Sequence, residues 1–465
     1  MEVNIFSARN LMFCLTGLLM LITSCGKVEE SKDPFIPLFD GKTLNGWHII
    51  GGDASYEVKD GTIVGTSTLN TRNTFLCSDQ NYGDFILEFD YKVDPKLNSG
   101  VQIRSNSIPE YRDGVVHGYQ IEIDPSDRAW SAGIYEEQDR GWLYSLGDNP
   151  KAQQAFKQNE WNSYRVEAIG DTLKTWINGV EAAHLIDDRT ASGFIGLQVH
   201  GIGNDEEKNG TQVIWKNIRI VTENLNKHAK TMNLPAKSTL NQLTDVEVKN
   251  GWKLLWDGKT SQGWRGAKLQ EFPENGWEIK DGILTVLASD GGESTGGGDI
   301  VTEDLYRDFE LKVDFKITEG ANSGIKYYVN TDLKKGEGSS IGLEYQILDD
   351  MRHPDAKLGN HDGSRTLASL YDLIEADKQK RVNPIGDWNH ARIVSQNKHV
   401  EHWLNGIKVL EYERGSDDYR KLVKESKYVD WPDFGEAEKG NILLQDHGNL
   451  VHFRNIKIRE INSEK

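Results

Sequence analysis

Two segments of the chain alternate carboxyl and amide side chains with apolar ones. Gln120 and Glu122 are separated by Ile121, so in an extended strand they share one face. Glu344 and Gln346 are spaced in the same way in the second half of the chain. A carboxyl group can act as a general acid or base, and amides can hold a polar ligand. The pattern predicts two polar faces with groups suited to proton transfer.

The same alternation adds further polar side chains to both faces. They are Gln102, Arg104, Gln198 and His200 in the first half, and Lys326, Tyr328, Gln445 and His447 in the second. Antiparallel sheets often have one solvated face, so a polar face without function is the alternative for any single strand. Because an acid, an amide and a histidine recur in both halves, we favour a site.

The elements that must position these side chains come in two copies. Several motifs return in the same order: Asp40-Gly41-Lys42-Thr43 as Asp257-Gly258-Lys259-Thr260, Asn98-Ser99-Gly100 as Asn322-Ser323-Gly324, and Trp176-x-Asn178-Gly179 as Trp403-x-Asn405-Gly406. The repeat is far longer than a solenoid unit of about 20–50 residues. It predicts two tandem domains, 34–222 and 251–462, joined by a polar linker over 223–250.

Each predicted domain is dominated by strands. Residues 85–93 and 309–317 alternate apolar and polar side chains, which is the period of a half-buried strand. The Asn-Gly pairs at Asn178 and Asn405 lie between strand-like residues and predict hairpin turns. Long helical periodicity is scarce. The sequence predicts an all-β protein made of two tandem antiparallel sandwiches.

The N-terminus has the features of an export signal. Arg9 precedes a mostly apolar run over 11–22 that is too short to span a bilayer. The run ends at Ile22-Thr23-Ser24-Cys25, which resembles a bacterial lipobox. We predict a lipoprotein signal over 1–25, a lipid on Cys25, a tether over 26–33, and anchoring to the membrane of a bacterial cell envelope. An ordinary cleaved secretion signal is the alternative.

Composition excludes some classes of partner. The net charge is −18, so the chain offers no basic stripe for nucleic acid. Cys77 would be the only other cysteine of the mature protein, so an intrachain disulfide is excluded there. Nothing indicates an organic cofactor. The loop after Glu344 holds Asp349 and His353, which could bind a divalent cation, although a solvated charged loop explains it equally well.

Glu122-x-Asp124-x-x-Asp127 raises a competing interpretation. It resembles the acid motif of retaining endoglucanases built on a jelly roll, which need two carboxyl groups about 5–5.5 Å apart. The last acid of that motif is Glu, whereas this chain has Asp127. Ordinary glycoside hydrolysis is therefore kept as an alternative.

The combined motifs resemble the 3-keto-disaccharide hydrolase domain family, also described as 3-keto-glucoside 1,2-lyase/3-keto-2-hydroxyglucal hydratase. The segments that carry the resemblance are Leu38-Phe39-Asp40-Gly41-Lys42-Thr43, Asn322-Ser323-Gly324-Ile325, Gly342-Leu343-Glu344-Tyr345-Gln346-Ile347, His402-Trp403-Leu404-Asn405-Gly406 and Leu444-Gln445-Asp446-His447-Gly448. The family implies concanavalin A-like jelly rolls and action on glycosides oxidised at carbon 3. The carbon-3 ketone acidifies the carbon-2 proton, so a base can remove it and expel the carbon-1 substituent; the 2-hydroxyglycal formed is then hydrated.

The resemblance implies roles for the polar faces. In the second domain the base would be His447 or Glu344, and Lys326 or a divalent metal would face the enolate. The sugar would be oriented by Gln346, Gln445, Tyr371 and Tyr328. The first-domain counterparts would be Glu122, His200, Gln120, Gln198, Gln102, Tyr135 and Arg104. The first copy has its acid and amide exchanged relative to the second. A non-catalytic carbohydrate-binding lipoprotein, or one catalytic and one binding domain, is the alternative function.

Overall fold

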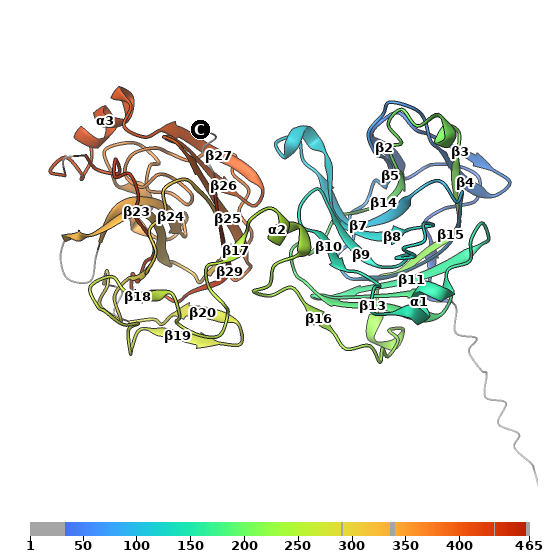
Figure 1. The fold of residues 1–465 in the computed structure, drawn as a ribbon, viewed down its shortest axis with the longest axis horizontal. Helices are drawn as coiled ribbons and strands as arrows, with labels where there is room; N and C mark the ends of the chain where they lie inside the picture. Colours follow the sequence, from blue (N-terminus) through green and yellow to red (C-terminus); the bar gives the residue numbers. More distant parts are fainter. Residues whose placement is uncertain (1–32, 290–291, 335–339, 432, 462–465) are drawn as a thin grey trace, which may run out of the picture.

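The structure is a computed structural model that describes residues 33–289, 292–334, 340–431 and 433–461. The predicted signal, Cys25 and most of the tether lie outside the described residues. None of the helices in the described part has the length and apolar character needed to cross a membrane. The chain folds into two β-sandwiches that lie side by side (Figure 1).

The first domain packs a nine-stranded sheet against a seven-stranded one. The larger sheet has, in spatial order, β16 (Lys237–Ser238), β13 (Val180–Ile186), β12 (Thr172–Ile177), β11 (Asn162–Ile169), β6 (Phe85–Val93), β15 (Gln212–Val221), β4 (Thr62–Thr66) and β3 (Ser55–Lys59), with β1 (Ile36–Pro37) on β15. The smaller one, here called the first site sheet, has β10 (Gly141–Tyr144), β9 (Ile134–Glu137), β8 (Val116–Ile123), β7 (Ser99–Ser107), β14 (Phe194–Val199), β5 (Thr74–Ser78) and β2 (Trp47–Gly51).

The second domain repeats this plan with an eight-stranded and a five-stranded sheet. The larger has β19 (Trp277–Lys280), β20 (Ile283–Val286), β29 (Val451–Glu460), β22 (Phe309–Ile317), β25 (Asn389–Gln396), β26 (His399–Leu404) and β27 (Ile407–Glu413), with β17 (Lys253–Leu254) on β29. The smaller, the second site sheet, has β18 (Trp264–Gly266), β21 (Ile300–Thr302), β28 (Asn441–Leu444), β23 (Asn322–Lys334) and β24 (Ser340–Leu348). The predicted all-β fold of two tandem jelly-roll sandwiches is confirmed.

Helices are short and lie in the connections. The α-helices are α1 (Pro150–Ala155), α2 (Asp245–Lys249) and α3 (Asp417–Lys424), and the 3-10 turns are η1 (Arg112–Gly114), η2 (Glu206–Lys208), η3 (Leu225–Lys227) and η4 (Pro354–Lys357). Each sandwich encloses its own apolar core, with Tyr119 and Trp215 in the first and Leu343 and Phe309 in the second. These cores fix which face of each site sheet remains polar.

Two of the repeated motifs are turns. Asp40 accepts backbone N–H bonds from Lys42 and Thr43, both at 2.7 Å, and Asp257 does the same for its own turn. Asn178 and Asn405 both adopt left-handed backbone angles, as the predicted hairpin turns require, and connect β12 to β13 and β26 to β27. These two motifs therefore recur because both domains need the same turns, and their recurrence does not indicate a catalytic role.

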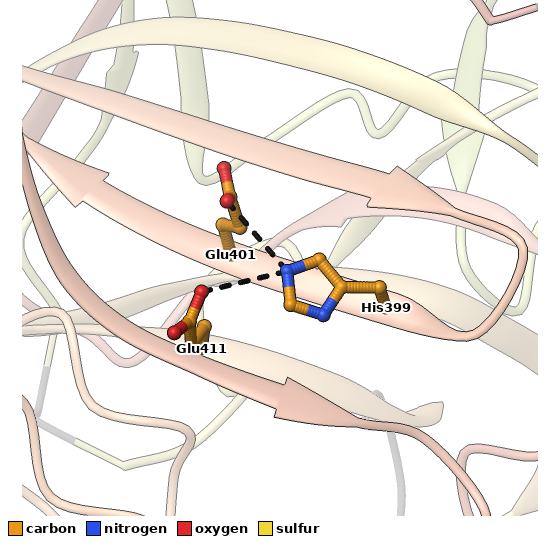
Figure 2. A group of neighbouring side chains, drawn as sticks. All are labelled: His399, Glu401 and Glu411. Atoms are coloured by element: carbon orange, nitrogen blue, oxygen red, sulfur yellow. Dashed lines mark ion pairs between the residues drawn. The ribbon is translucent and has the colours of Figure 1, made fainter.

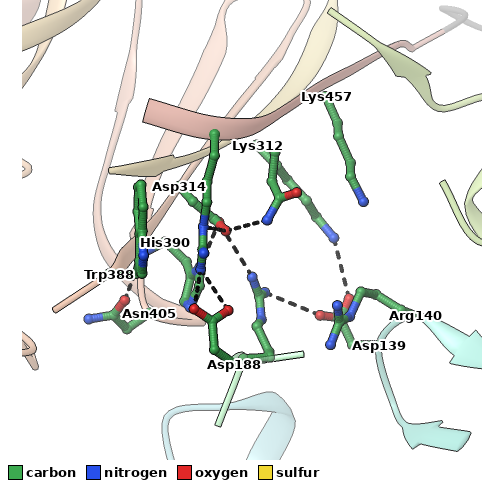
Figure 3. A network of polar contacts seen from close by, with 12 residues as sticks. Asp139, Arg140, Asp188, Lys312, Asp314, Trp388, His390, Asn405 and Lys457 are labelled. Atoms are coloured by element: carbon green, nitrogen blue, oxygen red, sulfur yellow. Dashed lines mark hydrogen bonds and ion pairs between the residues drawn. The ribbon is translucent and has the colours of Figure 1, made fainter. Parts of the chain in front are cut away.

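The segment predicted as a linker packs against both domains. β16 adds to the larger sheet of the first domain in parallel with β13, and α2 begins with a capping box formed by Thr244 and Glu247. Both carboxylate oxygens of Glu247 also accept hydrogen bonds from the Lys457 ammonium of β29, at 2.9 and 3.0 Å. Figure 3 shows the wider network of ion pairs around this junction. It includes Arg454 of the second domain, which donates to Asp188 of the first at 2.6 Å.

We expect Glu247→Gln to destabilise the protein by about 3 kcal/mol, because it leaves the buried Lys457 ammonium without its counter-charge. Urea unfolding monitored by tryptophan fluorescence would measure the loss. Glu278→Gln on exposed β19 is the matched control. Equal stability of the two variants would show that the pair contributes nothing to the domain junction.

Candidate functional site

The polar face of the second site sheet gathers the predicted residues of that domain. Lys326 on β23 lies opposite Glu344 on β24, and Gly324 lies opposite Gln346. Gln445 follows the end of β28 and donates its backbone N–H to the carbonyl of Gly324. The alternation of these strands thus brings an ammonium, a carboxyl group and two amides onto adjacent positions of one face.

Lys326 lies at the centre of a group of carboxylates. Its Nζ is 3.9 Å from Glu344 Oε2, 4.0 Å from Asp299 Oδ2 and 3.9 Å from Glu293 Oε1. Lys326, Glu344 and Asp299 are all buried, whereas the Glu293 side chain is half exposed. Three carboxylates around one ammonium exceed its charge, so the buried acids compete for ionisation.

Burial and the neighbouring charges together shift the pKa values of this group. Burial raises the pKa of Asp299 to about 7, although the Lys326 ammonium acts in the opposite direction. Burial also raises the pKa of Glu344, again offset in part by Lys326. The pKa of Lys326 is raised, because the attraction of Glu344 and the other acids outweighs its burial. Near neutral pH the site therefore holds a cation beside the Asp299 carboxyl group, which can both give and take a proton.

Several buried polar atoms of this face lack partners. Among the described residues, none hydrogen-bonds Asp299 Oδ2, Gln346 Nε2, Gln445 Oε1 or His447 Nδ1. Buried polar groups are normally paired, so unpaired ones need an explanation. A polar ligand on this face would supply the missing bonds.

The rim adds rings and charges. Tyr371 donates its backbone N–H to the carbonyl of Glu344, and its hydroxyl donates to Asp355 at 2.8 Å. The Lys427 ammonium lies 4.1 Å from the centre of the Tyr371 ring. His447 and His353 face each other at right angles with ring centres 6.1 Å apart. The predicted residues Tyr371 and His447 thus lie at the border of the group around Lys326.

Asp299 was not predicted from the sequence. It follows Gly296-Gly297-Gly298 and precedes β21, which is too short for alternation to reveal its face. The loop is fixed by Asp446, whose Oδ2 accepts N–H bonds from all three glycines at 2.9–3.2 Å. The available signal was the repeat: alignment of Asp84 with Asp308 places Asp299 at the position of Phe75, so an acid stands where the first copy has an apolar residue.

Gly324 has a steric role. A Cβ at this position would lie 2.3 Å from Glu344 Oε1, so only glycine lets this carboxylate lie across β23 toward Lys326. Gly100 stands in the same relation to Gln120 in the first domain. The repeated Asn-Ser-Gly motif therefore makes room for the side chain on the neighbouring strand.

The predicted metal ligands are engaged in turns. Asp349 accepts N–H bonds from Gly320 and Met351 and contacts Arg352, and His353 Nδ1 accepts the N–H of Asp355. They do not present a free set of donors for a metal ion. Among the described residues, a group that could hold an ion is His399, Glu401 and Glu411, shown in Figure 2. That group lies on the larger sheet and already contains the Lys408 ammonium, 2.6 Å from Glu411.

Two face predictions were wrong. Tyr328 does not share a face with Lys326: its hydroxyl lies in the core, 2.7 Å from Ser395 Oγ on the opposite sheet. Arg104 likewise donates to the carbonyls of Gly83 and Gly170, both at 2.8 Å, away from the polar face. Both residues have left-handed backbone angles where the strand registers shift. This bulge reverses the alternation that the prediction assumed.

The first site sheet is polar but differs in charge. Gln102 Nε2 donates to Gln120 Oε1 at 2.7 Å, and Gln120 Nε2 donates to Glu122 Oε2 at 2.9 Å. Burial raises the pKa of Glu122 to about 7, although hydrogen bonds donated by Asn98 and Gln120 act in the opposite direction. Neither the nitrogen nor the oxygen of the Gln198 side-chain amide has a hydrogen-bond partner in the described part of the chain. Gln102, Gln120 and Glu122 thus form one chain of hydrogen bonds, to which Gln198 does not belong.

The remaining predicted residues of this domain lie around that chain. Tyr135 on β9 lies opposite Gln120, and the His200 ring contacts the carbonyl of Gly201 at 2.7 Å. Asp124 is occupied by a turn, because Ser126 and Arg128 donate to its carboxylate at 2.6 and 2.8 Å. Asp124 of the competing acid motif is therefore held by its own turn, and Asp127, the last acid of that motif, is exposed.

Comparison with known proteins identifies the family of both domains. The family model described as the 3-keto-alpha-glucoside-1,2-lyase-like domain matches residues 34–221 and 251–459. Over 233 residues, 46% of this chain and 79% of the other, the sequence is 35% identical to a 3-keto-disaccharide hydrolase of Bacteroides thetaiotaomicron. Two crystal structures of provisionally named glycosyl hydrolases of Parabacteroides distasonis ATCC 8503 also match. They have identities of 33% and 31%, TM-scores of 0.41 and 0.31, and cover 48% and 43% of this chain and 100% and 99% of their own. The chain belongs to the 3-keto-alpha-glucoside-1,2-lyase-like domain family, whose fold it contains twice.

Proposed function

We propose that the second domain cleaves 3-keto-glycosides by elimination across carbons 1 and 2, followed by hydration of the 2-hydroxyglycal. Membership of the family supports an enzyme that acts on carbohydrate. The observation that carries the proposal is the buried Lys326 ammonium between Glu344 and Asp299. A cation flanked by two carboxyl groups is what an enolate-forming reaction needs.

In the elimination step the Glu344 carboxylate removes the proton from carbon 2. The electron pair moves toward the carbon-3 ketone, and the Lys326 ammonium stabilises the enolate oxygen. The bond from carbon 1 to the aglycone oxygen then breaks as the double bond forms. Asp299 protonates the departing oxygen, since burial raises its pKa to about 7 and keeps part of it protonated at neutral pH.

Hydration uses the same groups in the opposite roles. The Asp299 carboxylate takes a proton from water, whose oxygen adds to carbon 1. Glu344, now protonated, returns a proton to carbon 2. The sum is hydrolysis of the 3-keto-glycoside with both acids restored. Gln346, Gln445 and His447, whose unpaired atoms face this region, would bind the sugar hydroxyls.

His447 is the other candidate for the base. Its ring is only partly buried and its Nδ1 is unpaired in the described structure, so it could also accept a proton. Glu344 is favoured because it directly neighbours the ammonium that would stabilise the resulting enolate. The lipid anchor at Cys25, with a location in the cell envelope, also remains part of the proposal. A divalent cation remains the alternative to the Lys326 ammonium as the group that faces the enolate.

The test uses the full chain in detergent, a 3-keto-glucoside with a chromophoric aglycone, and the unoxidised glucoside as the paired control. We expect aglycone release from the keto substrate alone. A chelator added to the same assay tests whether a divalent cation takes part. Release from the unoxidised glucoside would instead support the two-carboxylate hydrolase. Failure to release from either substrate, with divalent metals supplied, would support a binding protein.

A further inference from the structure

The two site sheets have equivalent strand pairings, but the side chains at equivalent positions differ in charge. Gln102 lies opposite Gln120 on β7 and β8, just as Lys326 lies opposite Glu344 on β23 and β24. The charged pair Lys326 and Glu344 of the second domain is therefore replaced by two uncharged amides in the first domain.

The third charge is also absent from the first domain. Leu197 on β14 pairs with Leu76, and Leu444 on β28 pairs with Ile300. The residues that precede Leu76 and Ile300 are therefore equivalent, so Phe75 occupies the position of Asp299. The first site sheet has no counterpart, at these three positions, of the groups that would stabilise an enolate or protonate a leaving group.

The first domain nevertheless keeps groups that bind a polar ligand. Gln198, at the position of Gln445, is completely buried, and both of its amide atoms lack a hydrogen-bond partner among the described residues. It lies opposite Gly100, whose neighbour across β8 is Glu122. An unpaired amide costs free energy in the folded protein, so its presence next to the hydrogen-bonded chain of Gln120 and Glu122 points to a ligand that satisfies it.

Aromatic rings continue the row of amides. Trp142 on β10 pairs with Tyr135 on β9, which pairs with Gln120 on β8. The Trp142 and Tyr135 rings are only partly buried and lie 5.3 Å apart. Arg128 lies 4.9 Å from the Trp142 ring centre and 3.7 Å from Glu122. Partly exposed rings next to amides suit the apolar face and the hydroxyl edge of a pyranose.

A cavity adjoins two neighbours of Glu122, the acid that accepts a hydrogen bond from Gln120. Asn98 and Arg128, which both contact Glu122, line a cavity of about 490 Å³ together with His200. A second cavity of about 290 Å³, which shares Gly201 with the first, is lined by Phe75 and Glu137. The larger volume is within the range of small-molecule sites.

We propose that the first domain binds an uncharged saccharide through Gln198, Gln120 and Trp142 and does not carry out the elimination. The second domain then supplies the chemistry, and the first holds the glycan near it. The proposal rests on the proposed function only for the roles of Lys326 and Glu344. Its site and its ligand class rest on the first domain alone.

The test uses the full chain with Glu344→Gln, so that turnover does not consume the ligand. Binding of maltose, cellobiose and trehalose is followed by calorimetry, with glucuronate as an anionic probe. We expect at least one neutral disaccharide to bind with one site per chain, and glucuronate to bind more weakly. Gln198→Met in this background should weaken binding at least tenfold while the melting temperature stays the same or rises, because the free amide has no bond to lose.

Gln212→Met, an exposed change on β15 of the opposite sheet, is the matched control and should bind normally. Trp142→Ala provides a second variant at the aromatic end of the row. The proposal is overturned if none of the neutral disaccharides binds, or if both Gln198→Met and Trp142→Ala leave binding unchanged. It is also overturned if the Glu344→Gln chain keeps a turnover that Glu122→Gln removes. Turnover of a 3-keto-glucoside that survives both changes would contradict the role of Glu344 as the base and would leave the binding proposal for the first domain unaffected.

Discussion

Glu344→Gln is expected to lower the rate of aglycone release from a 3-keto-glucoside by about 10³-fold, within the usual range for loss of a general base. The amide keeps the shape of the side chain over Gly324 but cannot accept the carbon-2 proton. The fall should appear in kcat, with KM changed little. Hydrogen–deuterium exchange at carbon 2 of the substrate, followed by NMR, should be lost in parallel.

Glu303→Gln, an exposed acid that follows β21, is the control and should retain full turnover. His447→Ala distinguishes the two candidate bases. If His447→Ala abolished carbon-2 exchange while Glu344→Gln retained it, the base would be His447 and Glu344 would only position Lys326. Retention of exchange by both variants would place the reaction elsewhere.

The pH dependence of the wild-type enzyme follows from Asp299. Because burial raises the pKa of Asp299 to about 7, the acid that protonates the leaving group is progressively lost above that pH. The rate should therefore decline on the alkaline side, and Asp299→Asn should be slow at every pH without this decline. An aglycone that needs no protonation should rescue Asp299→Asn.

Lys326→Met is expected to have the second large effect, on both catalysis and stability. Turnover should fall by about 10²–10³-fold, because the enolate loses its stabilising charge. The variant should also lose about 3–5 kcal/mol of stability at pH 8, where Glu344 and Asp299 would be buried without a counter-charge. Urea unfolding and the assay of aglycone release measure the two effects.

The stability of the Lys326→Met variant should depend on pH. Burial raises the pKa of Asp299 and of Glu344 above their ordinary values, and removal of Lys326 should raise both further. The folded state then binds more protons than the unfolded state between the ordinary and the raised pKa values, so stability falls as pH rises through this window. Lys326→Met should therefore be closer to wild type at pH 5 than at pH 8. Lys280→Met, exposed on β19, controls for loss of a surface charge, and an equal loss of stability at both pH values would show that the carboxylates are not coupled to Lys326.

The amino-acid sequence alone determined the architecture of this protein. Apolar residues at alternate positions bury one face of each strand, which predicted the two sandwiches and placed Lys326, Glu344 and Gln346 on one polar face. The Asn-Gly pairs require left-handed turns, so they predicted the hairpins at Asn178 and Asn405. These features depend on neighbours along the chain and are therefore visible without tertiary structure.

Tertiary structure decided the details of the site. The bulges at Arg104 and Tyr328 reverse the direction of a side chain through one backbone angle, which no alternation pattern records. Asp299 joins Lys326 only because the pairing of β21 with β28 and the Asp446 contacts fix a glycine-rich loop beside β23. The raised pKa values of Asp299 and Glu344 likewise come from burial beneath residues distant in sequence. Sequence patterns specify which way a regular strand faces, whereas the proximity of charges and their exclusion from water arise only when separate strands pack together.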